Sequence, residues 1–207
     1  MKYNSKEILN YTIENRRYLH SIPELGENLP KTREFVIKKL EKLNIEYTKN
    51  KKDSGIIAFI KGNPENENNK IVALRADMDA LPIKEETDFE YKSCNNNMHA
   101  CGHDVHTAIL LGAGKILSEN RDKINGTVKL LFQTGEETGT GAKIMIEEKA
   151  LENVSAIFGV HIGNFAPDTP NGIFILQEGP IMASTDKLII RVKGKGTHGA
   201  YPHLGAD

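Results

Sequence analysis

Three histidines and a cysteine lie within nine residues of this chain, in Met98-His99-Ala100-Cys101-Gly102-His103-Asp104-Val105-His106. Imidazole and thiolate groups bind borderline-soft divalent metals well. Cys101 and His103 are two residues apart, so they cannot share one face of a helix, but a turning backbone aims both at one point. Gly102 between them permits the dihedral angles of such a turn. The stretch predicts a metal site on a loop just before a helix; the alternative is a histidine-rich surface loop with a buried cysteine.

Chemically active side chains also follow three predicted strands. In open α/β sheets, catalytic groups collect at the carboxyl ends of the strands, so the positions directly after each strand test the metal-site hypothesis. Every one of these positions carries a group that binds metals or moves protons: Asp77 and Asp79 after 71–75, Glu136 and Glu137 after 127–132, and His161 after 156–160.

The two acidic pairs suggest different roles. Asp77 and Asp79 share a face of an extended backbone, and Asp79 fits an orienting role, accepting a hydrogen bond from a ligating imidazole. Glu136 and Glu137 are adjacent, and two crowded carboxylates repel each other unless a cation lies between them. One of them then binds the metal and the other accepts a proton from water that the metal activates. The alternatives are turn-forming aspartates before Pro82 and a solvated acidic turn that caps the next helix.

Hydrophobic periodicity predicts the elements that position these residues. We expect helices at 4–20, 32–43, 104–118 and 140–149, and strands at 55–61, 71–75, 127–132 and 156–160. Strands that alternate with helices predict an α/β domain with helices around a mostly parallel sheet. The pattern changes near residue 172, where strands at 173–176 and 187–193 follow each other without a helix. We therefore expect a second domain to begin near residue 185.

Composition argues against several classes of protein. The length of 207 residues suits one large domain, or one domain and the start of another. A net charge of −1 predicts no nucleic-acid or membrane partner. No apolar run approaches a membrane span, and the N-terminus lacks the apolar core of a signal peptide. Two cysteines give no disulfide framework, so we expect a reducing, cytoplasmic location.

Five segments occur in an order that resembles a known family: Arg75–Ile83, Met98–Asp104, Gly135–Glu137, Gly179–Ser184 and Gly194–His203. Together they are similar to the amidohydrolase branch of the aminoacylase and carboxypeptidase-type di-metal hydrolases. That branch includes hippurate hydrolases, auxin-conjugate hydrolases and N-acetyl-diaminopimelate deacetylases. His20–Gly26 also resembles the N-terminal signature of the branch.

The resemblance implies a zinc-peptidase-like α/β catalytic domain over residues 1–184, followed by the start of an α+β lid and dimerisation domain at 185–207. It also implies two divalent metal ions, which are zinc, manganese, cobalt or nickel in such enzymes. The implied ligands are Cys101, as the bridging ligand, with His103, Glu137 and His161, and Glu136 is the implied general base. Asp79 falls where the wider superfamily has its orienting aspartate, and Asp77 where it has a histidine ligand.

The implied reaction is hydrolysis of the amide bond of a small N-acyl amino acid. His198 resembles the lid histidine that reaches into the site of a neighbouring subunit, which implies a homodimer; the alternative is a surface-loop histidine. Family members run to nearly twice this length and supply a further histidine ligand, so we expect the complete site to need residues beyond Asp207. The alternative functions are a catalytically inactive fragment and a non-catalytic metal-binding module.

Overall fold

The computed structural model describes residues 1–49, 55–63, 70–163, 170–181, 183–184, 186 and 188–206. The chain divides into two compact units, Met1–Asn164 and Phe165–Asp207. Among the described residues, every helix is too short or too polar to cross a membrane.

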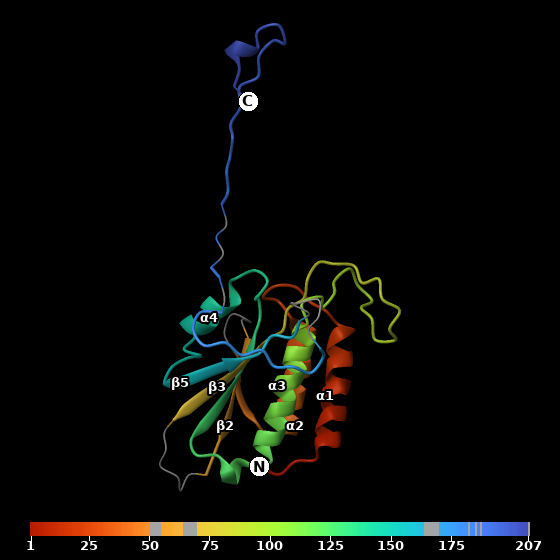
Figure 1. Cartoon of the computed structure of the whole chain (residues 1–207), viewed down its shortest axis with the longest axis vertical. Helices are drawn as coiled ribbons and strands as arrows, with labels where there is room; N and C mark the ends of the chain where they lie inside the picture. Colours follow the sequence, from red (N-terminus) through yellow and green to blue (C-terminus); the bar gives the residue numbers. More distant parts are fainter. Residues whose placement is uncertain are drawn as a thin grey trace. The chain divides into compact units, whose positions relative to one another are not determined.

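A five-stranded sheet forms the centre of the first unit (Figure 1). Its order is β1-β2-β4-β3-β5, and the bounds of β1 to β5 are Glu46–Lys49, Gly55–Lys61, Ile71–Asp77, Thr127–Gln133 and Val154–Gly159. Strand β3 lies between β4 and β5 and runs parallel to both. The carboxyl ends of these three strands therefore lie at the same end of the sheet.

The sheet is mixed, which corrects the prediction of a mostly parallel sheet. Strand β2 runs antiparallel to both β1 and β4. Parallel strands that follow each other in the chain need a crossover of about a dozen residues or more. In the sequence, β1 and β2 are separated by residues 50–54 and β2 and β3 by residues 62–70, which is too short for such a crossover, and β2 runs opposite to β1, β4 and β3. The sequence does not predict β1, because Glu46-Tyr47-Thr48-Lys49 has no apolar alternation.

Helices cover both faces of the sheet (Figure 1). On one face lie α1, α2 and α3, and on the other lies α4; their bounds are Ser5–His20, Pro30–Lys42, His103–Ser118 and Gly141–Glu147. Alternate residues of β4 point to the two faces. Leu130 and Phe132 pack in one buried cluster with residues of α2 and α3, whereas Leu131 packs with Met145 of α4. This period of two is what a sheet buried on both faces requires.

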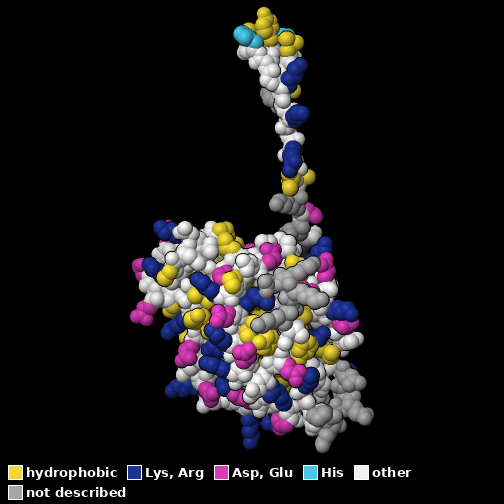
Figure 2. Space-filling model, turned by 180° about the vertical axis from the view of Figure 1, so that it is seen from behind, with side chains coloured by type: hydrophobic (Ala, Val, Ile, Leu, Met, Phe, Trp, Pro, Cys, Tyr) yellow, Lys and Arg dark blue, Asp and Glu magenta, His cyan; other side chains and the backbone are white. Residues whose placement is uncertain are grey.

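The surface of the first unit carries charges of both signs. Figure 2 shows Lys and Arg side chains interspersed with Asp and Glu side chains over the face seen from behind. Among the described residues of this face, charges of the two signs lie next to each other.

The second unit contains little regular structure within its described residues. Pro202–Leu204 forms a single 3-10 turn, and Lys195 makes an isolated antiparallel bridge with Ala206. The strands predicted at 173–176 and 187–193 are not present at 173–176 or 188–193, and Lys187 lies outside the described residues. Apolar side chains alone do not make a strand, because a strand needs a neighbour to pair with. The division into domains at 184/185 stays a prediction.

Replacing Leu130 with Ala tests the core. Leu130 is fully buried in the central strand β4, so Leu130→Ala should lower the free energy of unfolding by about 3 kcal/mol through lost burial and the cavity it leaves. Urea unfolding measures the change. Leu9→Ala is the matched control, because Leu9 is 58% exposed on α1, and its change should stay below about 0.5 kcal/mol. Equal losses in the two variants would contradict the assignment of the core.

Candidate metal centre

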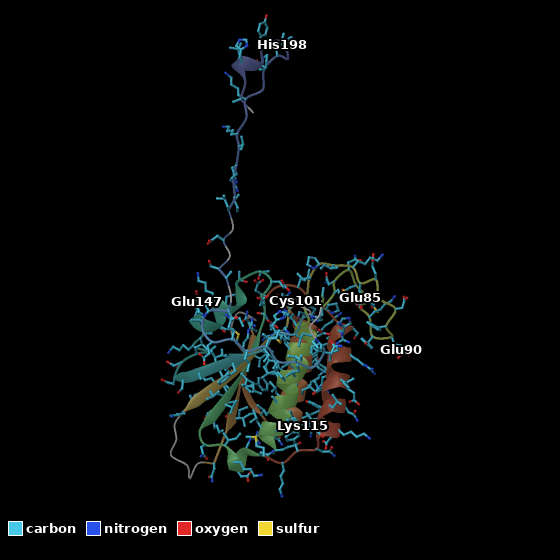
Figure 3. The ribbon with its side chains drawn as sticks, viewed as in Figure 1. Glu85, Glu90, Cys101, Lys115, Glu147 and His198 are labelled. Carbon is cyan, nitrogen blue, oxygen red and sulfur yellow. The ribbon has the colours of Figure 1, made fainter. Side chains whose placement is uncertain are left out.

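The carboxyl ends of β3, β4 and β5 meet the N-terminal end of α3. Figure 3 shows Cys101 at this end of α3. The hydroxyl of Thr107, in α3, donates a hydrogen bond to the carbonyl oxygen of Asp77, the last residue of β3, at 2.7 Å. All predicted site residues of the first unit lie in this region: Asp77, Asp79, Cys101, His103, Glu136, Glu137 and His161.

Gly102 allows the chain to turn from Cys101 into α3. Its φ of 85° lies in the left-handed region, where side chains are strained. A Cβ atom at this position would also lie 2.8 Å from side-chain atoms of Ile162. The positive φ thus favours glycine, and a larger residue would also have to displace the Ile162 side chain. The turn places Cys101 just before the helix and His103 at its first residue, as the spacing of the sequence predicts.

Among the described residues, the possible metal ligands form three groups that share one residue, His103, and two of these groups contain the predicted ligands. Ligand atoms of Cys101, His103 and His161 all lie within 4.8 Å of one another, and the same holds for His103, Glu136 and Glu137. Within the first group, Cys101 Sγ lies 3.4 Å from His161 Nε2. Sulfur, nitrogen and carboxylate oxygen are the donors that zinc and similar divalent cations bind.

His103 has the environment of a ligand. Its side chain is buried, and within the described part of the chain neither ring nitrogen makes a hydrogen bond. Nε2 is 3.7 Å from Asp77 Oδ2, 3.8 Å from Glu137 Oε1 and 3.9 Å from Glu136 Oε2. These distances are too long for hydrogen bonds, and a buried polar atom without a partner is costly. A cation among these atoms would satisfy the nitrogen, so the residues present fit a divalent metal.

Negative charge raises the pKa of two of the candidate ligands. Burial raises the pKa of the Cys101 thiol, and the carboxylates of Glu137 and Glu136 raise it further, to about 11. Burial acts to lower the pKa of His103, but Asp79 and the other nearby carboxylates outweigh it and raise that pKa above its ordinary value. The Cys101 thiol therefore keeps its proton near neutral pH and must lose it to bind a metal.

Asp79 holds the turn that carries the two glutamates. Its side chain is fully buried. Oδ1 accepts a hydrogen bond from the backbone N–H of Glu136 at 3.1 Å, and Oδ2 accepts one from that of Glu137 at 3.0 Å. Oδ1 also lies 3.4 Å from His103 Nδ1. One carboxylate thus contacts both the acidic pair and the central imidazole, which is the position expected of an orienting residue.

Asp77 lies behind His103 in an ionic network. Its Oδ1 atom lies 2.6 Å from His106 Nδ1, and its Oδ2 atom accepts a hydrogen bond from the Arg75 guanidinium at 2.8 Å. Burial acts to raise the pKa of Asp77, but the hydrogen bond from His106 and the charge of Arg75 outweigh it and lower the pKa to about 2. Asp77 is therefore ionised at neutral pH.

A second buried cluster supports the site from the side of α1. His20 Nδ1 lies 2.8 Å from Asp104 Oδ2, and His20 Nε2 lies 3.1 Å from Glu85 Oε1. The Arg16 guanidinium also contacts Asp104, at 2.9 Å. The cluster joins the end of α1, the segment after β3 and the first turn of α3. Sequence reasoning assigns it no role, because Glu85 and Asp104 lie far along the chain from Arg16 and His20, which are four residues apart on α1.

His99 and His198 differ from the histidines at the centre. His99 is buried, and burial lowers its pKa to about 4, so its ring is neutral near pH 7. His198 is exposed in the second unit, where its Nδ1 accepts a hydrogen bond from the backbone N–H of Ala200 at 3.2 Å. The role predicted for His198 in catalysis stays a prediction.

An α/β unit with cysteine, histidine and carboxylate groups at the carboxyl ends of its parallel strands is typical of a metal-dependent hydrolase. Residues 73–193 match peptidase family M20/M25/M40, and the chain belongs to this family. Its relatives place it in the amidohydrolase branch.

Two relatives and one solved structure illustrate the match. Thermostable carboxypeptidase 2 of Saccharolobus solfataricus is 44% identical over 211 residues, covering 100% of this chain and 52% of the relative. The N-acyl-L-amino acid amidohydrolase of Geobacillus stearothermophilus is 42% identical over 204 residues, covering 97% and 53%. The crystal structure of the Bacillus subtilis YXEP protein, a dinuclear metal-binding peptidase of the M20 family, has a TM-score of 0.73 and 39% identity, covering 79% of this chain and 45% of that one. The chain spans about half the length of these relatives.

The reactivity of Cys101 tests the electrostatics of the centre. In metal-free protein, a thiol with a pKa of about 11 is almost fully protonated at pH 8, so alkylation should be roughly 100-fold slower than for a thiol with the ordinary pKa of about 8.5. Iodoacetamide labelling of a Cys94→Ser variant measures this rate. In a Cys101→Ser variant the labelling rate is that of the exposed Cys94, and this rate serves as the reference. A Cys101 rate that levels off below pH 9 would contradict the proposed environment.

The His20 cluster should make stability depend on pH. The hydrogen bond with Asp104, opposed by burial, raises the pKa of His20, so its contribution is fully present below the unfolded pKa of about 6.5 and is lost as pH rises through the folded pKa. His20→Gln should therefore cost about 3 kcal/mol near pH 6, and less at pH 9. Urea unfolding across this range measures the difference. His203→Gln, at an exposed histidine, is the control, and a pH-independent cost for His20→Gln would contradict the prediction.

Proposed function

We propose that this chain carries the metal site of an amidohydrolase that cleaves the amide bond of small N-acyl amino acids. The observation that carries the proposal is the pair of ligand groups that overlap at His103, with an adjacent pair of carboxylates in one of them. The name of the Geobacillus relative, an N-acyl-L-amino acid amidohydrolase, supports the substrate class. The proposal concerns the complete protein, since the chain spans about half the length of its relatives.

Cys101, His103, Glu137 and His161 are the proposed ligands of two divalent cations. His103 belongs to both groups, but a ring nitrogen has one lone pair and binds one cation. A thiolate sulfur has several lone pairs and can bind two. Cys101 belongs to the first group, and its thiol interacts with Glu137 of the second, which supports Cys101 as the bridging ligand.

Glu136 is the proposed general base, and the difference in exposure between the two glutamates supports this choice. The Glu136 side chain is 42% exposed and that of Glu137 is 23% exposed. Glu136 is thus the more accessible carboxylate for water and substrate. Asp79 fixes the backbone of both residues through its two hydrogen bonds, so it positions the base without contacting the substrate.

The proposed reaction is the addition of water across an amide bond. Two divalent cations, which are zinc, manganese, cobalt or nickel, would supply the Lewis acidity that lowers the pKa of water and polarises the amide carbonyl. Glu136 accepts a proton from the attacking water as its oxygen bonds to the amide carbon. Glu136 then returns that proton to the nitrogen as the carbon–nitrogen bond breaks. The products are a carboxylic acid, which ionises, and a free amine.

Three further features belong to the proposal through family resemblance alone. Residues 185–207 begin the lid and dimerisation domain, the complete protein is a homodimer, and His198 from a second copy polarises the substrate carbonyl. The cytoplasmic location also stays a prediction.

Glu136→Gln in the complete protein tests the mechanism. The amide cannot accept the proton of the attacking water, so kcat for a cleaved N-acyl amino acid should fall about 1,000-fold, while the bound metal stays at the wild-type level. Steady-state assays with N-acetyl and N-benzoyl amino acids, and metal analysis by mass spectrometry, give the two numbers. Glu147→Gln is the control, since Glu147 is an exposed glutamate at the end of α4 (Figure 3).

The outcomes separate the alternatives. Wild-type kcat in Glu136→Gln would exclude Glu136 as the base. Loss of metal from this variant would make Glu136 a ligand instead. If the complete protein binds metal but cleaves no substrate in the panel, with dipeptides and C-terminal peptide bonds included, it is a non-catalytic metal-binding protein.

A further inference from the structure

His106 lies next to the candidate ligands but uses both of its ring nitrogens elsewhere. The side chain is buried in α3. Its Nε2 atom accepts a hydrogen bond from the backbone N–H of Ile162 at 2.9 Å. A backbone N–H can only donate, so Nε2 carries no proton, and the ring proton lies on Nδ1. That proton is donated to Asp77 Oδ1 at 2.6 Å.

This bonding pattern removes His106 from the set of ligands. Atoms of Asp77, His103 and His106 lie as close together as those of the other two groups. A metal ligand needs a ring nitrogen with an available lone pair, and the lone pair on Nε2 of His106 is already engaged by Ile162. The proximity of these three residues therefore indicates support for the site and not a third metal position.

Ile162 makes two hydrogen bonds through its backbone, and its side chain lies against the turn at Gly102. His106 holds its N–H group. Two atoms of its side chain, Cγ1 and Cδ1, lie 2.8 Å from the position that a Cβ atom on Gly102 would take. Its carbonyl oxygen lies 2.6 Å from His161 Nδ1, so it accepts the proton of that nitrogen. This arrangement places the lone pair of His161 on Nε2, the atom that faces Cys101 Sγ.

We propose that His106 is a positioning residue that sets His161 for cation binding. The connection runs from Arg75 through Asp77 and His106 to the peptide group between His161 and Ile162. It depends on the proposed function, because it assumes that His161 binds a metal. It assigns Asp77 a task that acts through His106, in contrast to Asp79, which holds the glutamate turn directly.

Two substitutions at position 106 separate this role from simple packing. In His106→Gln, the amide oxygen can reach the place of Nε2 and accept the hydrogen bond from Ile162. In His106→Asn, the shorter amide reaches the place of Nδ1, so it can donate to Asp77 but cannot reach Ile162. The proposal therefore predicts that the Gln variant retains the function of His106 and that the Asn variant does not.

The test is cobalt binding by the complete, metal-stripped protein. Chelator competition measures the affinity for Co²⁺, and the sulfur-to-cobalt absorption reports binding at Cys101. The affinity should fall 10- to 100-fold in His106→Asn and stay within about 3-fold of wild type in His106→Gln. Hydrogen–deuterium exchange of the metal-free protein should be faster at the Ile162 amide in the Asn variant alone. His203→Asn, at an exposed histidine, is the matched control.

Wild-type cobalt affinity in the Asn variant would overturn the positioning role and leave the proposed function intact. Equal losses in the Asn and Gln variants, accompanied by equal losses of thermal stability, would also overturn it, because they indicate packing alone. Failure of the wild-type protein to bind cobalt would overturn the proposed function, and the exchange at Ile162 would still report whether His106 holds that amide.

Discussion

The parallel pairing of β3 with both β4 and β5 is the constraint on which the rest of the site depends. It brings together the ends of three strands whose sequences are far apart. The segments after these ends carry Asp79, the glutamate pair and His161. A single antiparallel pairing at β3 would send one of these segments to the opposite end of the sheet. The antiparallel pairings of β2 leave the directions of β3, β4 and β5 unchanged, so the mixed character of the sheet does not separate these three ends.

The gathered groups leave an excess of negative charge. Asp77, Asp79, Glu136 and Glu137 lie around one buried imidazole. Arg75 partly neutralises Asp77, and the two hydrogen bonds from backbone N–H groups stabilise Asp79. The side chains of Glu136 and Glu137 lie 3.9 and 3.8 Å from His103 Nε2, too far for a hydrogen bond. Divalent cations would balance them, which is the physical reason that this arrangement suits a metal centre better than an acid–base pair alone.

Much of the first unit follows from local sequence signals. Its four helices and the strands β2 to β5 begin and end within two residues of their predicted positions, because apolar periodicity and turn residues mark them. The positions after the strands also identified the site residues that lie together. The direction of β2 and the existence of β1 were not predictable in this way, since both depend on pairing. The partners of His20 and His106 likewise become visible only in three dimensions.

The segment after residue 172 shows the limit of such signals. Its apolar runs satisfy the pattern of strands, yet residues 173–176 and 188–193 are not strands in the described part of the chain. Phe174 and Leu176 are 81% and 91% exposed. A strand forms only when two segments pair. The apolar pattern of one segment therefore predicts that it can pair, but not that a partner segment is present.

The absence of a side chain at Gly102 lets Ile162 lie against the turn that precedes α3. The Ile162 side chain fills the space that a Cβ atom on Gly102 would need, and the Ile162 N–H group donates a hydrogen bond to His106, so the segment after β5 is held against the start of α3. The backbone of Glu136 and Glu137 is held by hydrogen bonds to Asp79, and the two glutamate side chains are partly exposed. Cations of different radius would therefore be accommodated mainly by the exposed side chains of Glu136, Glu137 and His161, while the buried ring of His103 keeps its place.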